Sequence, residues 1–113
     1  MTLQERFNDF IIKGLELSEL RTQLKDLESK SYNVAGKEIS GEMAQSILDL
    51  SSSIDKLEED IKDIEKIQSS HYSQLVKDLK KIGAESIRMM ADGVYYRVSL
   101  DNNSGLLNFD PIN

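Results

Sequence analysis

The apolar residues in the first third of the chain recur at the spacing of an α-helix. Thr2 and Glu5 have the spacing of a capping box, in which each side chain satisfies a backbone N–H of the other residue. The pattern therefore predicts a helix over about residues 3–30. The recurring positions are Leu3, Phe7, Phe10, Leu17, Leu20, Leu24 and Leu27.

A second run of apolar residues follows a heptad repeat. All seven core positions of this repeat are apolar, and of the fifteen positions between them only Ala44 and Leu48 are. This pattern predicts a helix over about residues 41–82 whose apolar stripe forms a core or an oligomer interface, as in a coiled coil. The stripe consists of Met43, Ile47, Leu50, Ile54, Leu57, Ile61 and Ile64.

Breaks in the two patterns indicate where the helices end. The segment SYNVAGKEISG, residues 31–41, contains Gly36 and no helical periodicity, so we expect it to connect the helices. Lys80 and Lys81 followed by Gly83 are typical of a helix C-terminus, because lysines favour the last turn and glycine favours the residue after it.

The charged residues beside the stripe indicate which helix packs against it. A parallel pair of identical helices would bring Asp60 opposite Glu65 of the second copy, and symmetry would repeat this like-charge contact. An antiparallel return of the first helix, with facing residue numbers that sum to about 71, would set Glu65 beside Arg6 and Glu58 beside Lys13. An intrachain hairpin is therefore the preferred interpretation, and a parallel coiled coil is the alternative.

The same register predicts an unpaired end of the second helix. Leu3 would lie opposite residue 68, so residues 69–82 would extend about 20 Å past the first helix at 1.5 Å per residue. We expect the C-terminal segment to cover this apolar overhang.

Two short runs that alternate in polarity flank Asp92-Gly93, which is a strong signal for a two-residue β-hairpin turn. With this turn, opposed residues sum to 185, so that Met89 faces Tyr96 on an apolar face. The competing interpretation extends the second helix through AESIRMM, but Gly83 argues against it.

A third strand is predicted after the loop NNSG, residues 102–105. If the loop has four residues, opposed residues sum to 207, so that Leu100 meets Leu107 and Val98 meets Phe109. Both registers keep apolar residues together on one face, which supports a three-stranded meander.

The expected fold class is α+β: a long antiparallel α-helical hairpin, similar to a coiled coil, followed by a small three-stranded antiparallel β-meander. The chain of 113 residues has the length of a single domain. Residues 1–82 would form the hairpin, and residues 83–113 would form the meander, packed on the helix end.

Composition excludes several classes of site. The chain has no cysteine, which removes disulfides, zinc–thiolate sites and thiol nucleophiles. The first residues contain acids and no long apolar run, so a signal peptide and a membrane span are not expected. A net charge of −6 disfavours nucleic acid and anionic membranes as partners. We expect a cytoplasmic protein.

The strand register brings Arg88 opposite Arg97, beside Tyr95 on the polar face of the sheet. Facing like charges destabilise a cross-strand pair, and two guanidinium groups near a tyrosine could bind a phosphate or a carboxylate. The plainer interpretation is that Asp110 neutralises Arg97 and that Arg88 is solvated.

Other candidate sites carry weaker signals. Asp101 and Asn103 alternate in DNNSG, but the pattern lacks the glycine position and the final acidic residue of a calcium loop, so turn chemistry explains it. His71, the only histidine, falls on the stripe and is expected to be structural. No metal, cofactor or catalytic arrangement is predicted.

The sequence thus favours a non-catalytic protein–protein interaction protein, a scaffold or adaptor built on a self-associating helical hairpin. A homodimer is the preferred oligomer, and a sheet edge or the helix ends would contact a partner. The alternative is a small regulatory module that binds an anionic ligand or peptide through Arg88, Arg97 and Tyr95.

Overall fold

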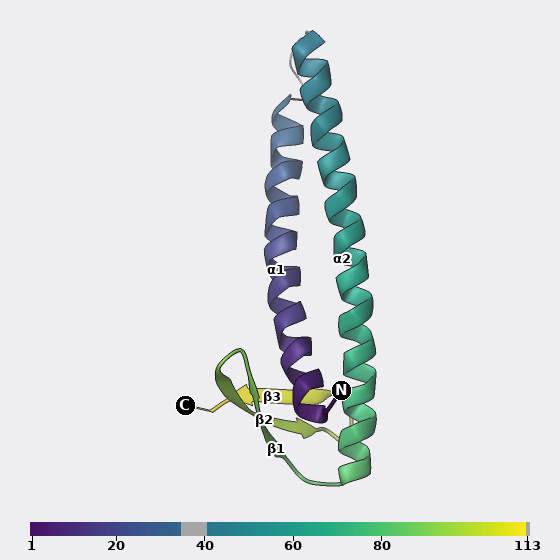
Figure 1. Ribbon diagram of the computed structural model, residues 1–113, viewed down its shortest axis with the longest axis vertical. Coiled ribbons are helices and arrows are strands. Elements are labelled where there is room, and N and C mark those ends of the chain that lie inside the picture. Colours follow the sequence, from purple (N-terminus) through teal and green to yellow (C-terminus); the bar gives the residue numbers. More distant parts are fainter. Residues whose placement is uncertain (35–40, 113) are drawn as a thin grey trace. The chain divides into compact units, whose positions relative to one another are not determined.

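The computed structural model describes residues 1–34 and 41–112, without the side chains of residues 31–34, 42 and 43. It confirms the predicted α+β fold, because two antiparallel helices are followed by a three-stranded antiparallel sheet (Figure 1). Most of the expected connector and the side chain of Met43 lie outside the described residues. The elements are α1 (Leu3–Val34), α2 (Gly41–Ile82), β1 (Ile87–Ala91), β2 (Val94–Leu100) and β3 (Leu107–Pro111).

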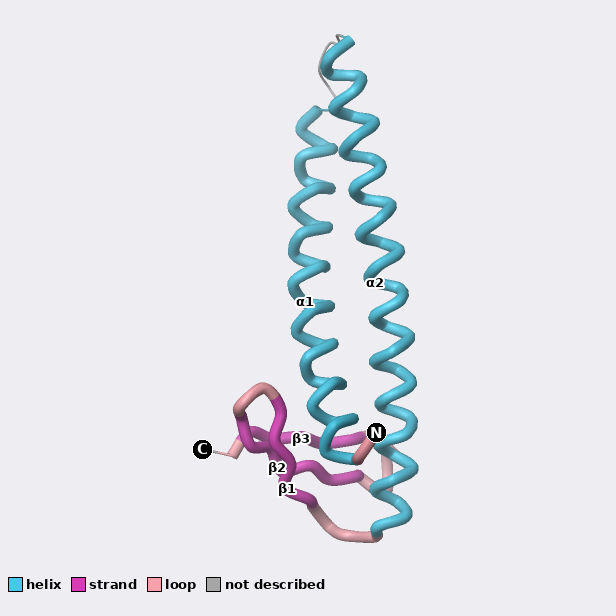
Figure 2. The backbone as a smooth tube through the Cα atoms, viewed as in Figure 1, coloured by secondary structure: helices cyan, strands magenta, loops and turns pink. Residues whose placement is uncertain are grey.

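The ends of the helices follow from local hydrogen bonds. At the start of α1, the Glu5 backbone N–H donates to Thr2 Oγ1 at 3.1 Å, and the Thr2 N–H donates to Glu5 Oε1 at 3.2 Å, which is the predicted capping box. At the end of α2, Gly83 has a φ of 71° and its N–H donates to Leu79 O at 3.0 Å. Between these ends each helix is unbroken (Figure 2).

The sheet has the strand order β1-β2-β3, and both predicted registers are confirmed. Met89 pairs with Tyr96 across the first hairpin, and Val98 pairs with Phe109 across the second. Asp92 and Gly93 both have a positive φ, of 49° and 77°, as a two-residue turn of the mirror-image type requires. The competing extension of α2 through residues 84–90 is therefore wrong.

The chain divides into two compact units. The sheet unit comprises Met1–Leu15 and Lys66–Asn113, and the hairpin unit comprises Glu16–Glu65. The expectation of a single domain remains a prediction.

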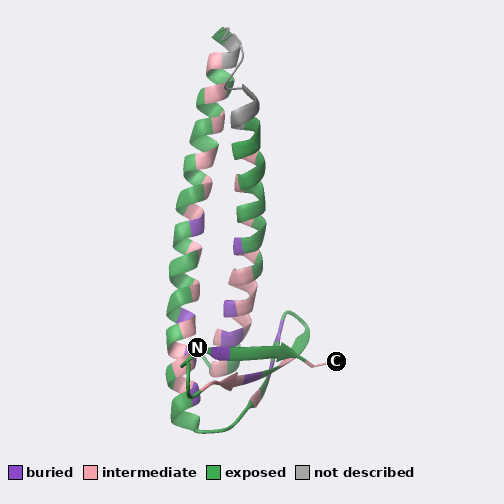
Figure 3. Ribbon diagram, turned by 180° about the vertical axis from the view of Figure 1, so that it is seen from behind, coloured by how far each residue is buried: buried purple, intermediate pink, exposed green. Residues whose placement is uncertain are grey.

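The sheet unit has a core in which the N-terminal part of α1 and the C-terminal part of α2 pack on one face of the sheet. Buried positions gather there in Figure 3, whereas the helices of the hairpin unit are mostly exposed or half-buried. The sheet thus covers the helix ends within this unit. The buried core residues are Phe7, Phe10, Leu75, Leu79, Met89, Ala91, Val98 and Leu107.

The helices pair in a different register from the one that the charges favoured. In the sheet unit the Phe10 and Tyr72 rings lie 5.8 Å apart, so facing residue numbers sum to 82. In the hairpin unit Arg21 Nη2 lies 3.0 Å from Glu65 Oε1. The expected pairing of Glu65 with Arg6 is therefore wrong, as is that of Glu58 with Lys13.

Packing energy explains this difference of about three helical turns. An exposed ion pair contributes about 0–1 kcal/mol, whereas a buried phenylalanine contributes about 3–5 kcal/mol relative to alanine. Phe7 and Phe10 therefore determine the register in the sheet unit. Leu3 then faces a level near Leu79, so the expected 20 Å overhang of α2 is also wrong.

Candidate functional site on the polar face of the sheet

Strand alternation places the three predicted site residues on one face of the sheet. Arg88 on β1 pairs with Arg97 on β2, and Met90 pairs with Tyr95 in the same ladder. All of these side chains are exposed, since they lie on the face opposite the core. The structure thus brings Arg88, Arg97 and Tyr95 together, and we call this surface the arginine face.

Arg88 and Tyr95 are in direct contact on the arginine face. The Arg88 guanidinium carbon lies 4.4 Å from the centroid of the Tyr95 ring. A cation in this position is attracted by the electrons of the ring, which stabilises an exposed pair by about 0.5–1 kcal/mol. This attraction partly offsets the repulsion expected between Arg88 and Arg97.

The arginines have no acidic partner in the described part of the chain. Asp110 on β3 pairs with Arg97 in the ladder, as expected. The ion pairs found among the described residues nevertheless include neither Arg88 nor Arg97. Asp110 therefore does not neutralise Arg97 by direct contact, and both guanidinium groups retain hydrogen-bond donors for an external acceptor.

The arginine face consists of exposed side chains of β1 and β2. A hollow of about 350 Å³ lies elsewhere in the sheet unit, where the end of α2 meets the end of β2. It is lined by Leu79, Lys80, Gly83, Ala84, Glu85, Leu100 and Asn102. None of the arginine-face residues borders this hollow.

Side chains from α1 cover part of the outer edge of β1. The Gln4 side-chain amide donates to Met90 O, and its oxygen accepts from Met90 N at 3.0 Å. Asn8 Oδ1 accepts from the Asp92 backbone N–H at 3.0 Å. These contacts satisfy groups that an unpaired edge would offer to another strand.

The outer edge of β3 is restricted in a similar way. Tyr72 from α2 accepts a hydrogen bond from the Leu107 backbone N–H at 2.9 Å. Pro111, at the other end of the strand, has no N–H. Among the surfaces of the sheet, the arginine face is therefore more available to a partner than either edge.

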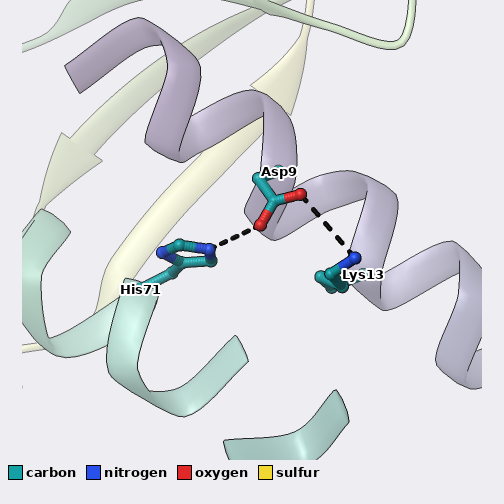
Figure 4. A network of polar contacts seen from close by, with 3 residues as sticks. All are labelled: Asp9, Lys13 and His71. Atoms are coloured by element: carbon teal, nitrogen blue, oxygen red, sulfur yellow. Dashed lines mark hydrogen bonds and ion pairs between the residues drawn. The ribbon is translucent and has the colours of Figure 1, made fainter. Parts of the chain in front are cut away.

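A polar cluster that the sequence analysis did not predict lies in the sheet unit. His71 is 8% exposed, and its Nε2 lies 2.6 Å from Asp9 Oδ2. Figure 4 shows Asp9 between His71 and Lys13, whose Nζ lies 3.9 Å from Asp9 Oδ1. His71 Nδ1 is buried and has no hydrogen-bond partner among the described residues. The expectation that His71 has a structural position agrees with this burial.

One signal in the sequence could have identified this pair. Asp9 interrupts the apolar first half of α1, and His71 interrupts the heptad repeat of α2. Two polar interruptions on facing apolar surfaces often belong together, since a buried polar group needs a partner. The incorrect helix register hid the match.

The loop between β2 and β3 is held by turn hydrogen bonds. Asp101 Oδ1 accepts from the Asn103 N–H at 2.9 Å, and Asp101 O accepts from the Gly105 N–H at 2.8 Å. The bond from the Asn103 backbone, together with bonds from Ser104, lowers the pKa of the Asp101 carboxyl. No group of three or more candidate metal ligands occurs among the residues that the structure describes.

The apolar stripe is only partly covered within the hairpin unit. Ile61 is buried, and the other described stripe residues are half-buried. The half-buried stripe residues are Ile47, Leu50, Ile54, Leu57 and Ile64.

In the described part of the chain, neither helix has a segment apolar and long enough to cross a membrane.

Comparison of the chain with protein-family models, with curated proteins and with solved structures found no match in any of the three. Functional inference therefore depends on the geometry of the two units.

Proposed function

We propose that the chain is a non-catalytic protein–protein interaction protein that self-associates through its hairpin unit, with a dimer as the first assembly. The observation that supports this proposal is the small core of that unit. Among residues 16–30 and 44–65, only Leu17 and Ile61 are buried. The core of the sheet unit, by contrast, contains eight buried apolar side chains.

The stripe residues of α2 are matched by half-buried leucines on α1, namely Leu20, Leu24 and Leu27. Covering a half-buried leucine or isoleucine stabilises an assembly by on the order of 1 kcal/mol, about half of the value for full burial. A second pair of helices would cover the stripe of α2 and the leucines of α1 together. A four-helix bundle formed by two hairpins with twofold symmetry is the simplest such arrangement.

The polar cluster of the sheet unit supports a non-catalytic role. His71 is the only histidine of the chain, and it is buried against Asp9. A general acid or base must reach the proton that it transfers, and a buried imidazole paired with a carboxylate is poorly placed for this. A cytoplasmic location and the absence of nucleic-acid partners remain predictions from composition.

Sedimentation equilibrium over a wide range of protein concentration tests the proposal. We expect a reversible dimer for the unmodified chain, and weaker association for Ile54→Gln, because this change places an amide in the half-buried stripe. Ser52→Gln is the matched control, since Ser52 is exposed on the same helix.

Circular dichroism of each variant shows whether its helices still form at the concentrations used. The proposal is overturned if the unmodified chain is a strict monomer at high concentration. It is also overturned if folded Ile54→Gln and Ser52→Gln associate equally well.

A further inference from the structure

Charge is distributed unequally between the two units. The hairpin unit contains 13 acidic and 6 basic residues, a net charge of −7, and the sheet unit contains 7 acidic and 8 basic residues, a net charge of +1. The net charge of the chain therefore resides in the unit proposed to self-associate. Two such units brought together repel each other unless opposite charges lie close to them.

The acidic charge is densest in residues 55–65, which we call the acidic segment. It contains six acids and two lysines. Glu58, Glu59 and Asp63 are exposed, and the ion pairs found among the described residues include none of them. Their carboxylates are available to an external cation.

The arginine face offers the complementary chemistry. A guanidinium group can donate two parallel hydrogen bonds to one carboxylate, and neither Arg88 nor Arg97 has an acidic partner in the described chain. Tyr95 and Met90 beside them are 47% and 43% exposed. Arginine, tyrosine and methionine are enriched at protein interfaces.

We propose that the arginine face of one copy docks on the acidic segment of a second copy. The exposure of these side chains favours a protein partner over a small anion, because small ligands bind mostly in concave sites that enclose them. Twofold symmetry creates the contact twice, and each contact offsets part of the repulsion between the hairpin units. This inference rests on the proposed self-association and identifies a surface that contributes to it.

Charge reversal tests the docking. One variant combines Arg88→Glu with Arg97→Glu, a second combines Glu59→Arg with Asp63→Arg, and a third carries all four changes. Sedimentation equilibrium at low ionic strength gives the dimer Kd. We expect each of the first two variants to dimerise about tenfold more weakly, which is about 1.4 kcal/mol. The third variant should recover to within about threefold of the unmodified chain, because the opposite charges face each other again.

Lys80→Glu with Lys81→Glu is the matched control. It changes the charge of the sheet unit by the same amount as the arginine variant, and both lysines are exposed in the last turn of α2. We expect less than about a threefold change in Kd, because these lysines lie off the arginine face. Thermal unfolding shows whether each variant is folded, and Arg88→Gln with Arg97→Gln replaces the reversal if the glutamates disrupt the sheet.

The possible results separate the two proposals. Dimerisation that is unchanged in the arginine variant overturns the docking and leaves the proposed self-association intact. The docking is also overturned if the lysine control dimerises as weakly as the arginine variant, or if the variant with all four changes does not recover its affinity. In either case net charge explains the effect. An unmodified chain that is monomeric at all concentrations overturns the proposed function itself.

Discussion

The imidazole of His71 is buried in the sheet unit and depends on a single side-chain acceptor. Asp9 Oδ2 lies 2.6 Å from His71 Nε2, while the other ring nitrogen has no partner among the described residues. The Asp9 side chain is 31% exposed and also lies near Lys13. Removal of Asp9 and removal of His71 should therefore have unequal effects. Loss of Asp9 leaves the buried imidazole without a hydrogen bond, whereas loss of His71 leaves a carboxylate that is in contact with solvent.

We predict that Asp9→Ala lowers the free energy of unfolding by about 1–3 kcal/mol, the cost of a buried polar group without a partner. His71→Leu should cost less than about 1 kcal/mol, because it leaves an apolar side chain in the core and Asp9 in contact with solvent. Urea unfolding of both variants measures the difference. Equal losses would show that the carboxylate does not stabilise the imidazole.

The carboxyl of Glu5 reports on the start of α1. Its hydrogen bond with the Thr2 side chain, and then that with the Thr2 backbone, lower the pKa of Glu5 in the folded chain. The ionised Glu5 carboxylate therefore stabilises the folded chain in full above the unfolded pKa of about 4.3. This stabilisation is lost as the pH falls through the folded pKa.

We predict that an NMR titration finds the pKa of Glu5 below its ordinary value, and that Thr2→Ala moves it back toward that value. A pKa of Glu5 that does not respond to Thr2→Ala would exclude the capping box in solution.

At the scale of elements, glycine has opposite roles in the first hairpin and in α1. Gly93 has a φ of 77°, a conformation that alanine adopts only with strain. Gly14 lies inside α1, where an added Cβ would approach Gln68 Nε2 to 2.9 Å. This nitrogen is the far end of a flexible side chain, which can move away.

The same substitution should therefore change stability in opposite directions. We predict that Gly93→Ala lowers the free energy of unfolding by about 1–2 kcal/mol, whereas Gly14→Ala raises it by about 0.5–1 kcal/mol through better helix propensity. Thermal or urea unfolding measures both effects. Destabilisation by Gly14→Ala would mean that Gln68 is held in place more firmly than its position indicates.

An element could be predicted where its signal comes from residues that are close together in the sequence. The first strand register follows from Asp92-Gly93, the second from the loop of residues 102–105, and both from alternation over a few residues. Local chemistry was therefore sufficient, and it also placed Arg88 opposite Arg97. The helix register depends on contacts such as that of Phe10 with Tyr72, which are distant in sequence. Apolar periodicity identifies the faces of two helices but not their relative shift, and exposed charges are too weak to determine it.

At the scale of the whole molecule, the two units differ in how their stability can arise. The sheet unit contains its own buried core, whereas the hairpin unit buries only Leu17 and Ile61 among residues 16–30 and 44–65. Helix pairs that bury little apolar surface are marginally stable in water, because most helical stability in proteins comes from packing. If the hairpin unit is stabilised by association, its stability must depend on protein concentration, because a partner that binds only the folded state stabilises by mass action.

We predict that amide hydrogen exchange in residues 44–57 slows as the protein concentration rises, by up to about tenfold for a hundredfold increase in concentration above the dimer Kd, because the fraction of free monomer falls only as the square root of the concentration. Amides of β2, in the middle of the sheet, should slow less, because the sheet core is complete within one chain and only the docking of the arginine face depends on a second copy. Mass spectrometry of peptides from both regions in the same sample provides this internal control. Protection of residues 44–57 that is independent of concentration would show that the hairpin unit is stable without a second copy, and the half-buried stripe would then need no partner to explain it.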